Sequence, residues 1–475
     1  MGSRRARSPR GTGVLLLLAL AAAACSPRPA GVHATTGPKD ILVVVMDTLR
    51  QDRVGSYGYA RRTTPELDAL ASRGTRFANA RSTSTWTSPA HASLFTGLLP
   101  MAHGTNQERW DLFTPSPTLA EVLSAHGYRT VGAVGNPMLA TQHGFARGFE
   151  DYHEAWTVEH PWLERLRPTS VDERAVRYAE GRLAEEPDRP LFLFVNLIGI
   201  HSPYDSCGAS CGLFGADPAQ GVCENRWQDY YLGRISLDAP TLRRLSDLYD
   251  AEVHEVDRLM GELVARFEAV RGARPQLVIV TSDHGENLGD HGHVDHVFSL
   301  YESTVRVPLV LLGDGVAAGE RVDAPVQLHD LFPTVLEAAG VGTEALHVQG
   351  LPLRSVPADR PAVLEYDRPV QATRILEEHA TPEEKARLEV YQRRLQAIVA
   401  GGQKLIRGDD GLRELYDLAA DPTERVDLAS QRPTAPLELA LDAIVRRDGR
   451  QKPSGSTPLE DEETRHALQA LGYLE

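Results

Sequence analysis

Three apolar runs of strand length constrain the fold of this chain more than any other feature. They are ILVVVM (41–46), LFLFVNLIGI (191–200) and LVIVT (277–281). A strand that is apolar on both faces has to be buried on both faces, as in a parallel sheet covered by helices. Segments of helical periodicity lie between the runs, among them TPELDALASRG and LSDLYDAEVHEVDRLMGELVARF. The alternation predicts an α/β fold with a mainly parallel sheet and helices on both faces.

The pattern changes near residue 355. Short segments with turn signals follow (AVLEY, LQAIVAGGQKLIRG, LRELYDL), and then a helical segment over 462–471. They predict a small C-terminal α+β subdomain with an antiparallel sheet. We therefore expect a leader at 1–24, a Pro/Gly/Thr-rich linker at 25–39, the main domain at 40–355 and the subdomain at 356–475.

The leader has the features of an export signal. Four arginines precede an apolar run over 14–24 that is too short to span a bilayer, and Cys25 follows it. The small residues before Cys25 resemble a bacterial lipobox, which would leave Cys25 lipidated and the protein held at a membrane. Ala22 stands where that motif more often has Leu, so ordinary secretion is the alternative. We expect an exported protein, either secreted or lipid-anchored in the bacterial cell envelope (periplasm or outer membrane).

The charge of the chain argues against one class of partner. The formal net charge is -15, and removal of the leader, with four arginines and no acidic residue, leaves about -19. A chain this acidic is a poor ligand for the nucleic-acid backbone, so no nucleic-acid partner is expected.

Three cysteines of the mature chain lie in one short segment: Cys207, Cys211 and Cys223. In an oxidising compartment they predict a local disulfide with one thiol left over, and the pairing stays open. A three-cysteine metal site is the alternative. No His or fourth Cys stands at zinc-site spacing, which favours the disulfide.

Polar residues follow the apolar runs where parallel strands would end: Asp47, Asn136, His201, Asp283 and His284. Ligands of open α/β sheets lie beyond the carboxyl ends of the strands, so these residues indicate a site. Carboxylates with an imidazole can hold a divalent cation, and the donor set admits Zn or Mn as well as Ca or Mg.

A polar-to-apolar stretch, TWTSPAHASLFTGLLPMAHG (85–104), predicts a helix next to this site. Thr87 or Ser88 suits the N-cap, and Pro89 suits the first turn. A helix N-terminus presents free N–H groups and a positive dipole end, which favour an anion such as a phosphate or sulfate ester.

Taken together, several segments resemble the sulfatases of the alkaline phosphatase superfamily. They are ILVVVMDTLRQD, TSPAHASLFTGLLPMAHG, GYRT, FLFVNLIGIHSPY, TSDHGENLGDHG, SLYESTVRVPL and ELYDLAADPTE, in family order from about residue 38 to the end. The resemblance implies an alkaline-phosphatase-like three-layer α/β/α sandwich, a C-terminal subdomain and metal-assisted attack on a sulfate or phosphate ester.

The resemblance also implies roles for single residues. Asp47, Thr87, Asp283 and His284 match metal ligands, and Thr87 matches the nucleophile as well. His201 and His296 fall where the family places substrate-contacting and acid/base groups, and many sulfatases have Lys at the position of His296. The implied cofactor is a divalent metal ion (Ca, Mn or Zn), with one ion or two left open.

This chain departs from the sulfatase pattern at several positions, and these departures limit the reactions that it is expected to catalyse. Sulfatases carry a Cys or Ser that becomes formylglycine where this chain has Thr87, so formylglycine is not expected. They carry Arg where this chain has His91, a second Asp in place of Thr48, and often another Lys in the segment of Asn136. We expect His91 and Asn136 to face the substrate. Oxidation of Thr would give a ketone and not the aldehyde. A formylglycine hydrate has a second hydroxyl that expels sulfate, and a sulfated Thr has no such group. Thr87 therefore suits phosphoryl chemistry better.

The leading hypothesis is a sulfatase-like hydrolase that cleaves phosphate, phosphonate or sulfate esters through Thr87. Its substrate would be a small-molecule, glycan or lipid ester. A Thr-x-Pro pattern also occurs in nucleotide pyrophosphatase/phosphodiesterases and in phosphoethanolamine-type transferases of the same superfamily. The alternatives are accordingly a phospho-headgroup transferase at the membrane, or a catalytically inactive sulfatase-like binding protein. The sequence does not fix the oligomeric state.

Overall fold

The structure is a computed structural model of the whole chain. It describes residues 38–157, 170–205, 207–217, 227–378, 380–449 and 462–470. The predicted leader, the lipidation site at Cys25, nearly all of the linker and Cys223 lie outside these residues. No helix within the described ranges has the length and apolar character that a membrane crossing requires.

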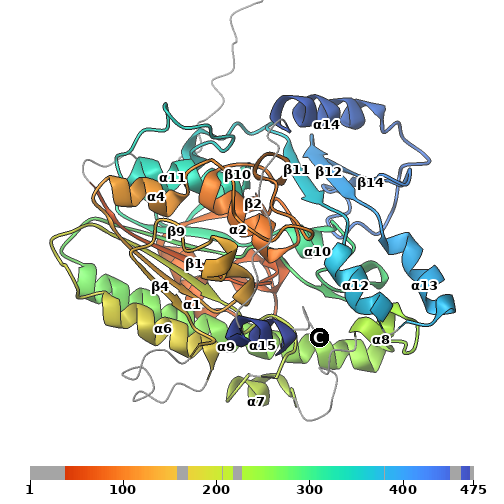
Figure 1. Cartoon of the computed structure of the whole chain (residues 1–475), viewed down its shortest axis with the longest axis horizontal. Helices are drawn as coiled ribbons and strands as arrows, with labels where there is room; N and C mark the ends of the chain where they lie inside the picture. The colour runs from red at the N-terminus through yellow and green to blue at the C-terminus, as the bar shows by residue number, and fades with distance from the viewer. Residues whose placement is uncertain are drawn as a thin grey trace, which may run out of the picture.

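A sheet of eight strands in the order β10-β2-β9-β6-β1-β5-β3-β4 forms the centre of the described chain (Figure 1). Neighbouring strands are parallel except at β9, which runs antiparallel to both β2 and β6. The strands are β1 (Asp40–Met46), β2 (Thr75–Arg81), β3 (Arg129–Val134), β4 (Asp151–Glu154), β5 (Leu191–Leu197), β6 (Gln276–Thr281), β9 (Leu309–Gly313) and β10 (Glu320–Gln327).

The alternation of side chains along β1 explains why this sheet is covered on both faces. Leu42, Val44 and Met46 belong to one apolar cluster, whereas Ile41 and Val43 belong to another. Every residue of the strand is buried. Burial on both faces is what makes the run continuously apolar, so the predicted mainly parallel sheet is confirmed.

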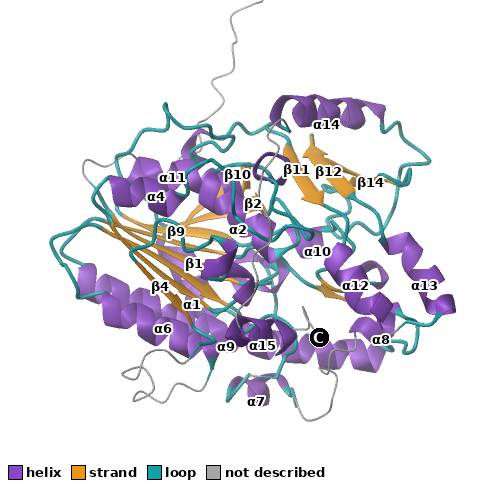
Figure 2. Cartoon of the chain, viewed as in Figure 1, coloured by secondary structure: helices purple, strands orange, loops and turns teal. Residues whose placement is uncertain are grey.

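Helices pack on the two faces of the sheet (Figures 1 and 2). The first cluster is completed by α1 (Pro65–Arg73), α6 (Val171–Arg182) and α9 (Ala239–Arg271), and the second by α2 (Thr87–Thr96), α4 (Leu119–Ala125) and α11 (Leu331–Ala338). Shorter helices are α3 (Pro100–His103), α7 (Ser210–Phe214), α8 (Trp227–Tyr231) and α10 (Glu302–Val305). The three-layer α/β/α sandwich is therefore confirmed.

The C-terminal part contains a four-stranded antiparallel sheet, β11-β12-β13-β14. Its strands are β11 (Ala362–Tyr366), β12 (Leu395–Ala400), β13 (Gln403–Gly408) and β14 (Arg413–Asp417), with helices α12 (Val370–Glu378), α13 (Pro382–Leu388), α14 (Ala435–Asp448) and α15 (Glu462–Ala470). This confirms the predicted α+β subdomain. Its apolar face packs against Leu300 and Val305 of the main part, so the two share one core.

A buried network of charges joins the same two parts. Lys404 of β13 lies 3.1 Å from Glu302 and 2.8 Å from Glu424, and Arg81 of β2 forms two hydrogen bonds to Glu302. Each of these four side chains is almost fully buried. Breaking a buried pair leaves an uncompensated charge, so the network makes docking of the subdomain specific.

Two details of the predicted elements were wrong. The strand predicted over 191–200 ends at Leu197, so His201 lies in the turn that follows it rather than at the strand end. Neither Thr87 nor Ser88 caps the helix: Trp86 is the N-cap, without a side-chain hydrogen bond, and Thr87 is the first helical residue. The Thr87 hydroxyl is directed at other side chains instead of at the backbone.

The edge strand β10 was not predicted, because charged residues interrupt its apolar pattern.

The predicted local disulfide joins Cys207 and Cys211, whose Cα atoms lie 5.3 Å apart. Cys207 is buried in the first apolar cluster, and the following helix α7 packs on α9. The cross-link therefore fixes the excursion after β5 to the main sandwich.

Candidate active site

The carboxyl ends of β1 and β6 bring two aspartates together. These strands are parallel neighbours with Val45 opposite Thr281, so Asp47 and Asp283 each lie two residues beyond that pair. The Thr48 amide donates a hydrogen bond of 3.2 Å to Asp283 Oδ1 and thereby ties the two loops together. Thr48 has a φ of 59°, which is rare for a β-branched residue and is typical of strained functional loops.

His284 joins these two aspartates in a group of potential metal ligands, which is called the first cluster from here on. Asp47, Asp283 and His284 are all buried and offer ligand atoms that lie within 4.8 Å of one another. The carbonyl of Gly285 is 3.0 Å from His284 Nδ1 and can only accept, so Nδ1 carries the proton and Nε2 has the lone pair. Burial, together with the charge of His296, lowers the pKa of His284 to about 3, so the ring is neutral. A neutral imidazole with a free Nε2 lone pair is the form that binds metals.

The hydroxyl of Thr87 enters the same cluster from the N-terminus of α2. Its Oγ1 lies 3.3 Å from His284 Nε2 and 3.3 Å from Asn136 Nδ2. Because Thr87 is the first helical residue, the free N–H groups and the positive dipole end of α2 lie beside it. The site therefore combines a buried hydroxyl, a metal-type donor set and a helix terminus suited to an anion.

Two amides hold Asp47 in place. Asn136 donates to Asp47 Oδ2 at 2.9 Å, and Asn196 of β5 donates to the same oxygen at 3.2 Å. The Oδ1 of Asn196 in turn accepts from the backbone N–H of Asn136. Asn136 thus contacts Asp47 and Thr87 rather than open space. The sequence analysis missed Asn196, although a lone amide inside the apolar run LFLFVNL was a signal for it.

His91 lies within the site but behind the hydroxyl. Its Nδ1 is 2.9 Å from the carbonyl of Thr87 and 3.6 Å from Asp283 Oδ2, and the ring is fully buried between Phe95 and Phe194. This position supports the aspartate and the first turn of α2. Contact of His91 with the substrate remains a prediction.

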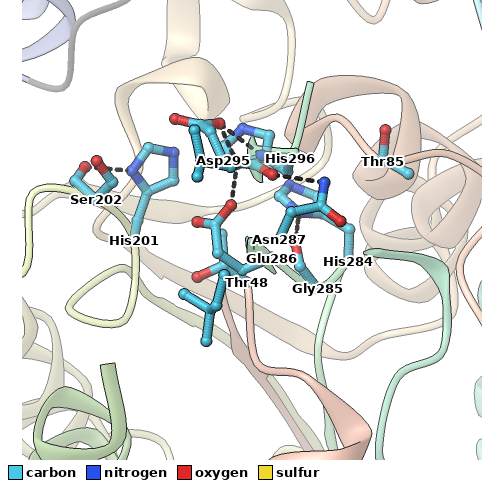
Figure 3. Close-up of polar contacts among 12 residues, drawn as sticks. Thr48, Thr85, His201, Ser202, His284, Gly285, Glu286, Asn287, Asp295 and His296 are labelled. Atoms are coloured by element: carbon cyan, nitrogen blue, oxygen red, sulfur yellow. Dashed lines mark hydrogen bonds and ion pairs between the residues drawn. The ribbon is translucent and has the colours of Figure 1, made fainter. Parts of the chain in front are cut away.

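His201 and His296 lie on the other side of the cluster. The His296 ring is 4.5 Å from that of His284, 5.0 Å from that of His201 and 5.6 Å from that of Trp86, between centroids. Figure 3 shows His201, Glu286, Asp295 and His296 gathered in one group. His296 therefore adjoins His284, which contacts Thr87, and His201 adjoins His296. The roles of both histidines remain predictions.

The first cluster fits a divalent cation. Within the described residues Asp47 Oδ1 and Asp283 Oδ2 are buried without a hydrogen-bond partner. Buried polar atoms without a partner are costly, so unused carboxylate oxygens facing one point indicate a ligand. Two carboxylates, an imidazole and a hydroxyl form a mixed N/O set that suits Zn²⁺ or Mn²⁺, whereas Ca²⁺ prefers six to eight oxygens.

Two further acidic residues, which the sequence analysis did not single out, lie beside the site. Glu286 and Asp295 lie beside His296, and their ligand atoms form a second group within 4.8 Å. Both belong to the segment GENLGDHGHVDH (285–296), whose density of Asp, Glu and His was a signal for them.

Comparison with protein families and curated sequences gives concordant matches. The family model described as Sulfatase matches residues 39–341. Choline-sulfatase of Rhizobium meliloti is 26% identical over 470 residues, covering 87% of this chain and 86% of that protein. Arylsulfatase K of Bos taurus is 25% identical over 486 residues, covering 90% and 86%.

Solved structures support the fold. A phosphonate monoester hydrolase of Agrobacterium radiobacter aligns with a TM-score of 0.68 and 21% identity, over 86% of this chain and 95% of that one. A phosphonate monoester hydrolase from Silicibacter pomeroyi aligns with a TM-score of 0.66 and 20% identity, over 88% and 96%.

Proposed function

Because the chain belongs to the sulfatase family, we propose that Thr87 is the nucleophile of a metal-dependent ester hydrolysis. At the coarser level the chain is a sulfuric or phosphoric ester hydrolase. The single observation that carries the proposal is the Thr87 hydroxyl, which is buried among Asp47, Asp283, His284 and Asn136 at a helix N-terminus. An unreactive structural threonine needs no such surroundings.

The residues of the site have different roles in the proposed reaction. Asp47, Asp283 and His284 would hold a divalent cation, which lowers the pKa of a nearby hydroxyl and withdraws charge from the ester oxygens. Asn136 orients both Thr87 Oγ1 and Asp47. The N-terminus of α2 faces the anionic group and stabilises the charge that develops on its oxygens.

The reaction proceeds in two displacements. The Thr87 oxygen attacks the phosphorus or sulfur atom as its hydroxyl proton leaves to solvent, the bond to the leaving oxygen breaks, and a protonated His201 or His296 gives that oxygen a proton. Water then attacks the same centre, the bond to Thr87 breaks, one proton of that water passes to the Thr87 oxygen, and the histidine takes up a proton from solvent. The site returns to its starting state.

Threonine at this position favours phosphorus over sulfur. The ester formed on Thr87 can be hydrolysed only by attack of water at the phosphorus or sulfur atom, because a Thr ester has no hemiacetal hydroxyl that could expel the anion. Metal-assisted attack of water at phosphorus is ordinary phosphoryl-transfer chemistry. We propose phosphonate or phosphate esters as the preferred substrates and sulfate esters as slower ones. Export and a lipid on Cys25 are part of the same proposal, so the substrate would be met outside the cytoplasm.

A panel of nitrophenyl esters tests the proposal. The full chain is assayed with sulfate, phosphate monoester, phosphate diester and phosphonate substrates, each with Ca²⁺, Mn²⁺ and Zn²⁺. Reactions with the best ester are quenched in acid, and the Thr87 peptide is analysed for a covalent adduct. We expect a phosphorus ester to have the highest kcat/KM, and an adduct on Thr87. A higher kcat/KM for the sulfate ester would refute the preference, and an adduct on Ser88 would refute the nucleophile.

Two variants separate nucleophile from packing. Thr87→Ser keeps a hydroxyl and should retain measurable turnover. Thr85→Ala, at a buried threonine two residues away whose hydroxyl contacts the Ser299 carbonyl, should leave turnover near the wild-type value. Equal losses in the two variants would mean that the segment matters only for packing.

A further inference from the structure

The turn that follows β5 carries His201, and a buried aspartate from α6 holds this turn. The backbone N–H of His201 donates to the Ile198 carbonyl at 2.8 Å, which closes the turn over residues 198–201. Asp172 accepts a hydrogen bond of 2.6 Å from the N–H of Ile198 and one of 2.7 Å from the N–H of Gly199. Two consecutive backbone donors at the start of the turn are therefore bound by one carboxylate.

Asp172 is an aspartate in surroundings that disfavour a charge. Its side chain is 3% exposed, and burial raises its pKa to about 6 although both amide hydrogen bonds lower it. In the described part of the chain no Arg or Lys forms an ion pair with it, and nearby Arg174 donates to the Ala155 carbonyl. A neutral asparagine would avoid the cost of burying a charge, but its single acceptor oxygen could bind only one of the two N–H groups. The position therefore requires two acceptor oxygens.

The space around this carboxylate is filled on two sides. A Cβ atom at Gly199 would lie 2.5 Å from Asp172 Oδ2, and one at Gly135 would lie 3.3 Å from Asp172 Oδ1. Gly135 directly precedes Asn136, and its N–H donates to the Asn196 carbonyl at 3.0 Å. Asp172 is thus enclosed between the turn that carries His201 and the loop that carries Asn136.

The imidazole of His201 is tied to the backbone next to this turn. Its Nδ1 lies 2.6 Å from the Ser202 carbonyl (Figure 3), which can only accept, so Nδ1 carries a proton and donates it. Nε2 is then the nitrogen from which a protonated His201 can give a proton to a leaving oxygen. Because the ring is bound to backbone beside the turn, its position follows the position of the turn.

We propose that Asp172 is a positioning residue for protonation of the leaving oxygen. By binding the N–H groups of Ile198 and Gly199, it fixes the turn and with it the imidazole of His201. Asp172 itself does not contact the ester. The inference rests on the proposed function and deepens it, because it takes His201, of the two candidate histidines, as the acid.

The dependence of the rate on the leaving group tests the proposal. The metal-loaded full chain and Asp172→Asn are assayed with two esters of the same acid group, one of nitrophenol and one of an alkyl alcohol. A nitrophenolate leaves without a proton, whereas an alkoxide needs one. General acid catalysis contributes about 10²–10⁴-fold, so Asp172→Asn should lower kcat/KM about tenfold for the alkyl ester and less than about twofold for the nitrophenyl ester. Equal losses with the two esters would overturn the proposal.

Asp257→Asn is a matched control, because Asp257 of α9 makes the same pair of contacts away from the site. It accepts from the N–H of Glu66 at 2.8 Å and from that of Leu67 at 2.9 Å, and burial raises its pKa to about 8. Asp257→Asn should lower Tm as Asp172→Asn does, but the ratio of kcat/KM for the two esters should stay at the wild-type value. An equal shift of this ratio in both variants would refute a role specific to Asp172.

Two further variants show whether the effect passes through His201. His201→Ala should lose activity mainly with the alkyl ester, and adding Asp172→Asn to it should cause no further loss of that activity. A further tenfold loss in the double variant, or an unchanged ester ratio in His201→Ala, would overturn the inference. If Asp172→Asn does not fold, Gly199→Ala gives the same test, since its methyl group displaces the carboxylate from the turn. An unchanged ester ratio in Gly199→Ala would also overturn it.

The covalent adduct separates this inference from the proposed function. An adduct on Thr87, together with an unchanged ester ratio in Asp172→Asn, would support the nucleophile and refute the positioning role. A shifted ratio in Asp172→Asn, together with an adduct on Ser88, would support the positioning role and refute the nucleophile.

Discussion

Replacement of Asn136 by alanine tests how the site holds its nucleophile. The amide nitrogen of Asn136 donates to Asp47 Oδ2 at 2.9 Å and lies 3.3 Å from Thr87 Oγ1, so one side chain connects a metal ligand with the proposed nucleophile. Alanine removes both contacts, and it also removes the hydrogen bond of 2.9 Å that Asn136 Oδ1 accepts from the Met138 amide, so Tm is measured beside the activity. Asn196 still donates to Asp47 at 3.2 Å, so the aspartate keeps one of its two amide donors.

The expected magnitude follows from these contacts. A hydrogen bond to a charged group contributes about 1.5–3 kcal/mol. With Asn196 still in place, about 2 kcal/mol of orientation and charge stabilisation is lost at the site. At about 1.4 kcal/mol per tenfold change in rate, kcat/KM should fall about 30-fold for Asn136→Ala. Metal content should stay at the wild-type level, because Asn136 is not a ligand in this account.

The assay is kcat/KM with the best nitrophenyl ester at saturating metal, alongside metal analysis and Tm. The matched control is Asn79→Ala, at a half-buried asparagine far along the sheet that donates to the Asp323 carbonyl of the edge strand β10, and it should change kcat/KM by less than about twofold. A kcat/KM for Asn136→Ala within about threefold of the wild type would refute the reasoning. So would an equal loss in Asn79→Ala.

Four other predictions concern stability and metal. Burial lowers the pKa of His103 to about 3, so the unfolded chain binds a proton below about pH 6.5 that the folded chain does not; the free energy of unfolding should fall by about 2 kcal/mol from pH 7 to pH 5 through this group, and His103→Gln should flatten the dependence of Tm on pH. Lys404→Met leaves Glu302 and Glu424 without their shared cation and should lower the free energy of unfolding by about 3–5 kcal/mol in urea titrations. Leu468→Ala opens the fully buried contact of α15 and should destabilise that helix by about 2–4 kcal/mol, measured as faster hydrogen exchange over 462–470. Chelation should abolish turnover and lower Tm, and added Mn²⁺ or Zn²⁺ should restore both.

Each of these has a contrary outcome. An unchanged pH profile in His103→Gln would mean that the ring is charged in the folded state. A stability loss below about 1 kcal/mol in Lys404→Met would show that the buried network is dispensable. Unchanged exchange in Leu468→Ala would show that α15 docks through other contacts, and full activity after chelation would remove the metal from the reaction.

The fold could be predicted because its strongest signals are local. A run such as residues 41–46 is buried on both faces whatever the rest of the chain does, and its length fixes it as a strand. The end of β5 could not be predicted, because Ile198 and Ile200 are as apolar as the strand before them and only tertiary contacts end the pairing at Leu197. The edge strand β10 alternates exposed and buried residues too irregularly for a periodicity argument.

The first cluster of the candidate site could be predicted for a different reason. Strand ends point at one edge of a parallel sheet, so Asp47 and Asp283 had to meet if β1 and β6 were neighbours. The group formed by Glu286, Asp295 and His296 depends on a short hairpin whose strands have two residues each, within a segment rich in polar residues. No pattern in the sequence fixes that register, and Glu286 and Asp295 could have been solvated like most acidic residues.

The central claim is that Thr87 carries the reaction on a bound metal. Turnover of the best ester by Thr87→Ala, with metal content measured in the same sample, tests it most directly. The account predicts loss of detectable turnover while the chain stays folded and the ligands Asp47, Asp283 and His284 still bind metal. Turnover near the wild-type value in a metal-loaded Thr87→Ala variant would contradict it.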